Sequence, residues 1–367
     1  SNYPFGAGLG QVSVPGIKPA KIVNPDLHWE ESEQTDVGLD FSFLNNAITF
    51  SADYFYKRTK DMLIEMPLAG FVGEVAPMGN VGTMENRGVE FEASYRWRVD
   101  DWNFRVAANA SWLQNKLINL GNASGFRTVE SAQGIGEMVR GTNGLPYPYF
   151  YGYKSDGIFQ NYDEINSYVN ERGELIQPNA VPGDVRWVDV NHDGKIDGDD
   201  QDMIGKGTPD WTYGFSLNVE WRGFDFSAVC QGVTGNDIFD ASRRTDITSA
   251  NLPTWMLNRW TGEGTSNRYP RYTANDQVNW SKSSDLYLTD GSYFRLKNIT
   301  LGYTLPSHIT RKAFVQNFRV YVMAENLLTA TKYAGFDPEV TNGSSLGVDR
   351  GVYPQSKVWT IGCNITF

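Results

Sequence analysis

The stretch YPQSKVWTIGCNITF, residues 353–367, alternates between apolar and polar positions. Its apolar positions are Trp359, Ile361, Cys363, Ile365 and Phe367. Successive side chains of a β-strand point to opposite faces, so this segment predicts a strand with one apolar and one polar face. A strand of this kind that closes on a terminal aromatic residue is typical of outer-membrane barrels, in which the apolar face meets lipid.

The same period of two recurs along the chain and predicts about nine strands. They are 34–44, 47–60, 82–98, 102–117, 211–222, 224–234, 292–305, 318–330 and 354–367. Their apolar faces carry no charge, whereas the opposite face of 82–98 carries two glutamates and two arginines. An imperfect phase from Arg295 to Asn298 indicates a bulge. No run of 18 apolar residues occurs, which excludes a helical membrane protein. We therefore expect an all-β fold, a transmembrane antiparallel β-barrel.

The connections between these strands alternate between short and long. The short ones are 45–46, 99–101, 222–223 and 306–317, and the long ones are about 62–81, 118–210, 235–291 and 331–353. Outer-membrane barrels have short periplasmic turns and long extracellular loops. Nine antiparallel strands leave the first and last parallel, so these cannot close on each other. We expect part of a larger barrel: an extracellular loop tail at 1–33, barrel strands over 34–367, and long extracellular loops at about 118–210 and 235–291.

Composition and the absence of known motifs exclude several classes of function. The formal net charge of −11 argues against a nucleic-acid partner. Cys230 and Cys363 occupy apolar strand positions and are expected to have no chemical role. No charged-then-apolar leader begins the sequence, so we expect the natural beginning of an exported protein to lie upstream. No phosphate loop, nucleophile elbow or His-Glu-x-x-His motif occurs, and we expect no enzyme.

Residues 189–200 match the spacing of a twelve-residue calcium loop. Positions 1, 3, 5, 7, 9 and 12 are Asp189, Asn191, Asp193, Lys195 (through its carbonyl), Asp197 and Asp200. Gly194 stands at position 6, where the sharp turn requires it, and Asp replaces the usual Glu at position 12. We predict a structural Ca²⁺, or a comparable hard cation, bound at about 10⁻⁴–10⁻³ M. The alternative is an Asp- and Gly-rich surface turn held by side chain to backbone hydrogen bonds.

Four ordered blocks of the sequence resemble SusC/RagA-type TonB-dependent transporters. They are NPDLHWEESEQ (24–34) with GLDF (38–41); PGD (182–184) with 189–200, 204–205 and 209–214; GSYFRLKNITLGY (291–303); and ENLLT (325–329) with Tyr333 and GFDPE (335–339). The resemblance implies a 22-stranded barrel with an N-terminal plug domain, of which this chain would supply about the last nine strands. The metal assignment to 189–200 agrees with the family pattern.

The resemblance also implies a function and a location. The chain would be part of a TonB-dependent nutrient importer in the outer membrane of a Gram-negative, Bacteroidetes-like bacterium. Its partners would be membrane lipid, a SusD-like surface lipoprotein, the remainder of the same transporter and, through the plug, TonB. The substrate would be an oligosaccharide or a peptide. A passive porin-like channel and a soluble calcium-binding β-protein that recognises carbohydrate remain as alternatives.

Aromatic residues of the long loops could stack on sugar rings, but we expect them to pack the loops or an interface. They are Tyr147, Tyr149, Phe150, Tyr151, Trp255 and Trp260.

Overall fold

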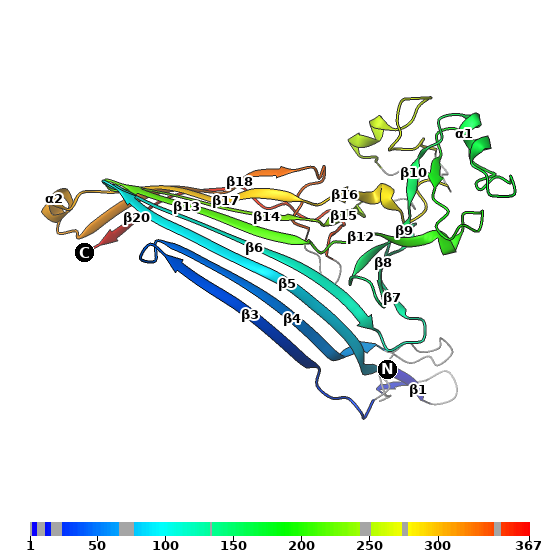
Figure 1. Ribbon diagram of the computed structural model, residues 1–367, viewed down its shortest axis with the longest axis horizontal. Coiled ribbons are helices and arrows are strands. Elements are labelled where there is room, and N and C mark those ends of the chain that lie inside the picture. The colour runs from blue at the N-terminus through cyan, green and yellow to red at the C-terminus, as the bar shows by residue number, and fades with distance from the viewer. Residues whose placement is uncertain are drawn as a thin grey trace.

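The computed structural model describes residues 2–5, 12–15, 24–65, 77–132, 134–242, 251–273, 278–340 and 346–367. Within these residues, one antiparallel sheet of nine strands stands in chain order, as the alternation predicts (Figure 1). Its strands are β3 (Glu31–Phe43), β4 (Ile48–Glu65), β5 (Met78–Val99), β6 (Trp102–Asn119), β13 (Trp211–Trp221), β14 (Phe224–Thr234), β17 (Tyr293–Thr304), β18 (Asn317–Thr331) and β20 (Val358–Thr366). We call this sheet the wall.

The wall is open, and its two edges are β3 and β20. Each strand is antiparallel to its neighbour, so the two edge strands run in the same direction. Backbone groups along both edges have no strand partner within the described residues. Such edges pair readily with further strands, as expected for part of a larger barrel.

Several wall strands extend beyond their predicted bounds. β4 continues to Glu65 and β5 begins at Met78, although the alternation fades near residues 60 and 82. Register shifts between Thr59 and Leu63 explain the difference, because each shift changes the face of the following residues while the pairing continues. β20 begins at Val358, four residues later than expected. In the predicted 1–33 tail, β1 (Asn2–Phe5) pairs with β2 (Val12–Pro15).

Short turns join the wall strands at one end. Arg222 and Gly223 have φ values of 47° and 90°, the positive values that a two-residue hairpin turn requires at both positions. The expected bulge is present: the β17–β18 register shifts between Leu296 and Asn298. It allows Tyr293, Arg295 and Lys297 to share the polar face with Asn298.

At the opposite end, the long connections fold into structures of their own (Figure 1). They contain three small sheets: β7 (Phe126–Ala132), β8 (Gly136–Thr142), β9 (Tyr149–Tyr153) and β12 (Gln201–Gly205); β10 (Ser155–Ile158) and β11 (Val185–Trp187); and β15 (Asp237–Asp240), β16 (Leu288–Asp290) and β19 (Val348–Asp349). The helices at this end are α1 (Tyr162–Ser167) and the 3₁₀ turns η2 (Gly198–Asp200), η3 (Thr254–Asn258) and η4 (Asp285–Tyr287), whereas α2 (Ser307–Thr310) and the 3₁₀ turn η5 (Arg311–Ala313) lie at the short-turn end. None of the described helices has the length and apolar content needed to span a membrane.

The main buried core lies in these loops rather than in the wall. Its members come from connections far apart in sequence and include Val139, Phe150, Trp187, Phe239, Trp280 and Val348. Phe239 and Val348 are also paired in the β15–β19 ladder, which joins the loop after β14 to the loop after β18. The loops therefore form one packed cap, while the wall buries little of its own apolar surface.

Candidate functional site

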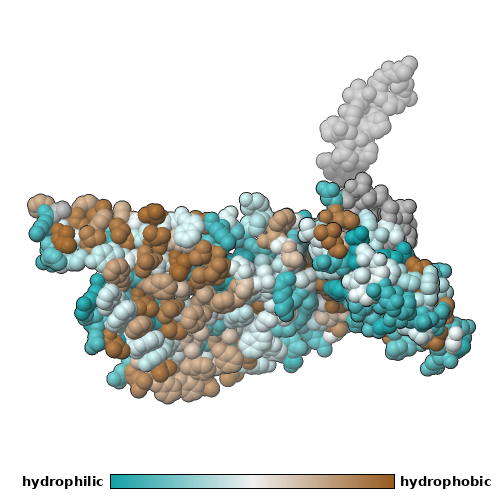
Figure 2. All heavy atoms as spheres, turned by 90° about the horizontal axis from the view of Figure 1, so that it is seen from above, coloured by the Kyte–Doolittle hydropathy of each residue, from teal (hydrophilic) through white to brown (hydrophobic). Residues whose placement is uncertain are grey.

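The apolar face of the wall is exposed. Phe41, Phe91, Leu301 and Ile361 lie on four different strands and are 45%, 38%, 54% and 84% exposed. Figure 2 shows apolar residues gathered over the strands, away from the polar loop end. Among the described residues of the wall, no Lys, Arg, Asp or Glu occupies this face between the two levels at which aromatic residues gather. A soluble protein rarely exposes so large an apolar surface, whereas a barrel turns it toward lipid.

Aromatic rings form a continuous row on this face at the turn end. The row runs through Tyr95, Trp97, Phe104, Trp102, Trp221, Phe224 and Tyr303, each in ring contact with the next. The ring centroids of Trp102 and Trp221 are 5.0 Å apart, and those of Phe224 and Tyr303 are 4.5 Å apart. We call this row the lower belt. Aromatic girdles of this kind mark the membrane–water interface.

A second group of aromatic residues lies toward the loop end. Trp211 pairs with Trp112 across the strands, and Tyr213 stacks on Phe294. Trp211 and Trp221 are the first and last residues of β13 and point to the same face. At about 3.4 Å per residue and a tilt of about 40°, this span covers about 25 Å, the height of the apolar band in outer-membrane barrels.

Charge returns to the outward face just beyond the upper aromatic residues. Across four strands, the register aligns Glu33, Arg58, Glu85 and Lys116, so that neighbouring charges have opposite sign. Arg58 Nε lies 3.7 Å from Glu85 Oε1. Arg87 lies on the same face one register step nearer the aromatic residues, and its Nε donates to Gln114 at 2.8 Å. Arg87 and this row together mark the upper limit of the uncharged band, because ions are costly in hydrocarbon.

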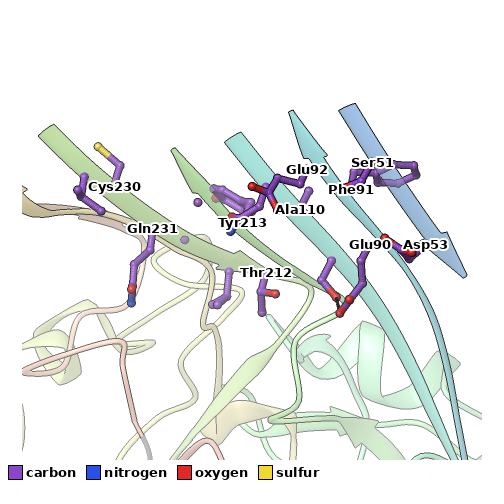
Figure 3. Close-up of a pocket in the computed structure, with 16 residues that line it drawn as sticks. Ser51, Asp53, Glu90, Phe91, Glu92, Ala110, Thr212, Tyr213, Cys230 and Gln231 are labelled. Carbon is purple, nitrogen blue, oxygen red and sulfur yellow. Dashed lines mark hydrogen bonds between the residues drawn. The ribbon is translucent and has the colours of Figure 1, made fainter. Parts of the chain in front are cut away.

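The opposite face of the wall is polar and hollowed. A cavity of about 660 Å³ is lined by groups that include Asp53, Glu90, Glu92, Thr212 and Gln231. Figure 3 shows Glu90, Thr212 and Gln231 on the loop side of the sheet and Cys230 on the other side. Ser111 donates a hydrogen bond to Glu90 at 3.3 Å. Among the described residues, none of the three carboxylates forms an ion pair, so this surface is acidic.

A basic hollow lies closer to the turns on the same face. Arg96 and Arg105 are directly opposite in the β5–β6 register, and Arg98 lies on the same face of β5. Together with Asn103 and Glu220, they line a cavity of about 500 Å³. The polar face is therefore basic near the turns and acidic at mid-height, as befits a water-filled lumen rather than a protein core.

A buried ion cluster ties the wall to the cap. Arg295 on β17 is 2% exposed, and its Nη2 lies 2.5 Å from Asp337 Oδ1 while its Nη1 lies 2.8 Å from Glu339 Oε2. Lys297 Nζ is also 2.8 Å from Glu339 Oε2. Burial alone would raise the pKa of Asp337, but hydrogen bonds from Arg295 and from the amides of Gln355 and Glu339 outweigh burial and lower it. The sequence blocks contain these residues, yet only the structure shows that they meet.

The predicted metal loop makes a sharp turn at Gly194. The amide of Gly194 donates to Asp189 Oδ2 at 2.8 Å, and Gly194 has a φ of 86°. The fully buried Asp200 accepts from the amides of Val190 and Asp197 at 2.9 and 2.7 Å. These hydrogen bonds position the first and last predicted ligands on the same turn.

The side chains of the loop do not converge on one centre. The Lys195 ammonium bridges Asp193 and Asp197, and the Asn191 side chain accepts from the amide of Asp193. Among the residues that the structure describes, no three His, Cys, Asp or Glu side chains form a metal-binding group. The donor types suit Ca²⁺, but the positions of these side chains suit the alternative surface turn equally, so the cation stays a prediction.

The loop aromatic residues mostly pack, as expected. Tyr149, Phe150 and Tyr151 are buried in β9, and Arg140 lies 3.4 Å from the ring centre of Tyr151. Trp255 stacks on Tyr269 at 4.8 Å. Tyr333 and Asp349 both belong to the connection between β18 and β20, where the buried Tyr333 hydroxyl donates to Asp349 Oδ2 at 2.5 Å. Burial and this hydrogen bond raise the pKa of Tyr333. Trp255, Tyr269, Tyr333 and Asp349 border a cavity of about 390 Å³ in the cap.

Comparison with known proteins finds relatives of one kind in sequence and in structure. A family model described as "TonB dependent receptor-like, beta-barrel" matches residues 2–327. TonB-dependent receptor P3 of Formosa agariphila is 31% identical over 98% of this chain and 36% of its own length. TonB-dependent receptor SusC of Bacteroides thetaiotaomicron is 27% identical over 100% of this chain and 34% of its own length. A solved structure of the RagAB peptide transporter aligns with a TM-score of 0.77 and 26% identity, over 100% of this chain and 38% of that one. The chain thus spans about a third of these relatives.

Proposed function

Because the chain belongs to the family of TonB-dependent receptor β-barrels, we propose that it forms part of the barrel wall and extracellular cap of an outer-membrane nutrient importer. The family is an outer-membrane family. The observation that carries the proposal is the uncharged outward band between two aromatic groups, backed by a polar inner face. In this placement the short turns face the periplasm and the packed cap faces outward. The open edges β3 and β20 would pair with the other strands of the same barrel.

The proposed activity is energised import rather than passive diffusion. The likeness to receptors named for TonB dependence supports this. Energy coupling would act through a plug domain upstream, and the acidic and basic hollows of the inner face would line the route or contact that plug. We expect this chain to have no enzymatic activity.

The proposed cargo is an oligosaccharide or a peptide, captured together with a SusD-like surface lipoprotein. The likeness to SusC and to a structure titled as a peptide transporter supports these two classes. The folded cap, with its aromatic and charged cavity beside Trp255 and Tyr333, offers a surface for a lid or a cargo. Gram-negative, Bacteroidetes-like cells would be the source, as for the relatives.

Uptake by cells that express the longer protein tests this proposal. Labelled oligosaccharides and peptides are supplied with and without a protonophore, which collapses the inner-membrane potential. The proposal expects uptake of one class that stops with the protonophore and in a strain without TonB. Uptake that continues under both conditions would indicate a porin. Recovery of the protein from the soluble fraction without detergent would indicate the soluble alternative.

We also propose that residues 189–200 bind a structural Ca²⁺, held by Asp189, Asn191, Asp193, Asp197, Asp200 and the carbonyl of Lys195. The shared turn of Asp189 and Gly194 supports this, and the Lys195 bridge opposes it. The ion would stiffen the connection between β11 and β12.

A further inference from the structure

The connection between β17 and β18, residues 305–316, carries exposed apolar side chains at the turn end of the wall. Ile309 in α2 is 49% exposed, and Phe314 after η5 is 90% exposed. Phe314 also has a φ of 59°, in the left-handed region that bulky side chains rarely adopt. The backbone thus holds a large aromatic side chain in solvent, and nothing among the described residues covers it.

The same connection carries a local excess of positive charge. Arg311 and Lys312 are consecutive and exposed, and His308 lies three residues before Arg311. Among the described residues, neither Arg311 nor Lys312 forms an ion pair. Because the whole chain has a formal net charge of −11, this small basic segment stands out. We call residues 305–316 the basic turn.

The basic turn continues directly from the lower belt. Tyr303, the last ring of that belt, is two residues before it. The amide of Leu305 donates to the carbonyl of Phe318 at 2.9 Å, and the amide of Gln316 donates to the carbonyl of Thr366 at 2.7 Å. Both ends are therefore tied to the wall, and Figure 1 shows α2 just beyond the strand ends. Exposed apolar groups next to unpaired cations, at the edge of a lipid-facing surface, match the chemistry of an interfacial anchor.

We propose that the basic turn binds the phospholipid surface of the periplasmic leaflet. Phe314 and Ile309 enter the interface, and Arg311 and Lys312 contact the phosphates of anionic headgroups. This inference rests on the proposed membrane placement of the wall. It assigns a lipid-binding role to a connection that would otherwise only join two strands.

Spin-label accessibility in the longer protein tests the inference. Cys230 and Cys363 are replaced by Ser together with any other cysteine, and a nitroxide is attached after Phe314→Cys. The protein is placed in nanodiscs of phosphatidylethanolamine and phosphatidylglycerol, and collisions with oxygen and with a water-soluble nickel chelate are compared. Reference labels at Leu301→Cys and Asp100→Cys report the lipid-facing strand and an exposed turn.

The inference expects the label at 314 to favour oxygen over nickel, as the label at 301 does. A nickel-accessible label at 314, with 301 still shielded, would overturn it and would indicate a periplasmic or luminal position. If the label at 301 is itself open to nickel, the membrane placement fails instead. The two failures are thus distinguishable.

Charge reversal tests the headgroup contact. Arg311→Glu combined with Lys312→Glu should shift the label at 314 toward water in phosphatidylglycerol nanodiscs and much less in phosphatidylcholine. Arg222→Glu is the matched control, because Arg222 is a basic residue of the neighbouring turn that pairs with Asp101 at 2.6 Å. An equal shift in both lipids, or none in phosphatidylglycerol, would contradict the contact.

Discussion

Arg295 Nη2 and Asp337 Oδ1 lie 2.5 Å apart, although the residues are 42 positions apart in sequence. One belongs to the wall and the other to the cap, and their side chains are only 3% and 7% exposed. Arg295 and Lys297, two residues apart on β17, point to the same polar face, and the Lys297 ammonium joins the same cluster through Glu339. This pair is the closest ionic link between the strand that carries GSYFRLKNITLGY and the loop that carries GFDPE.

Loss of one partner should release the loop after β18. Asp337→Ala leaves the Arg295 guanidinium buried without its main partner, a change that costs about 3–5 kcal/mol in buried pairs. We expect faster hydrogen exchange and easier proteolysis over 332–340. Lys332→Ala is the control, since its pair with Asp290 is 3.5 Å long and mostly exposed. Equal protection in both variants would contradict the link.

Acid should loosen the same loop within a defined pH window. The pKa of Asp337 is lowered from its ordinary value of 3.8, so its contribution to stability is fully present above about pH 4. That contribution is lost as pH falls through the lowered pKa, because protonation breaks the pair with Arg295. Local opening over 332–340, obtained from exchange rates divided by the intrinsic amide exchange rate at each pH, should therefore be constant from pH 7 to about 4 and rise below. Asp337→Asn should remove this rise, and a rise that persists unchanged in that variant would exclude the carboxylate as its cause.

Bound calcium should protect the connection between β11 and β12 from proteolysis, and the charge of Lys195 should weaken calcium binding. Lys195→Gln removes the ammonium that bridges Asp193 and Asp197, so calcium binding should tighten. Asp189→Asn should weaken it, whereas Asp199→Asn, outside the ligand positions, should not. Calorimetric titration and protease sensitivity over 182–210 measure both effects. The cation assignment is lost if millimolar calcium and its chelation leave the parent and all three variants unchanged.

The sequence predicts the wall better than the cap. Period-two alternation gives all nine wall strands, because a surface with lipid on one side and water on the other repeats along every strand. It fails at the upper parts of β4 and β5, where register shifts near Met62 move side chains between faces. The small sheets of the loops leave little trace, since strands such as β9 are buried on both faces and do not alternate.

The candidate sites divide in the same way. Local spacing finds the 189–200 turn, because its hydrogen bonds join residues at most ten positions apart. Local spacing cannot predict that Arg295 contacts Asp337 or that Tyr333 contacts Asp349. These partners are 42 and 16 positions apart, and their contact depends on how the chain between them folds. That Arg96 lies directly opposite Arg105 can likewise be known only from the register of β5 and β6.

Folding into lipid vesicles of variants at two successive β5 residues tests the central claim most directly. Phe91 and Glu92 are both exposed but occupy opposite faces of the wall at nearly the same depth. Phe91→Arg should place a charge in hydrocarbon, cost about 2–4 kcal/mol and reduce the inserted fraction of the longer protein, whereas Glu92→Arg should insert as the parent does. Equal insertion of both variants would contradict the assignment of the apolar face to lipid.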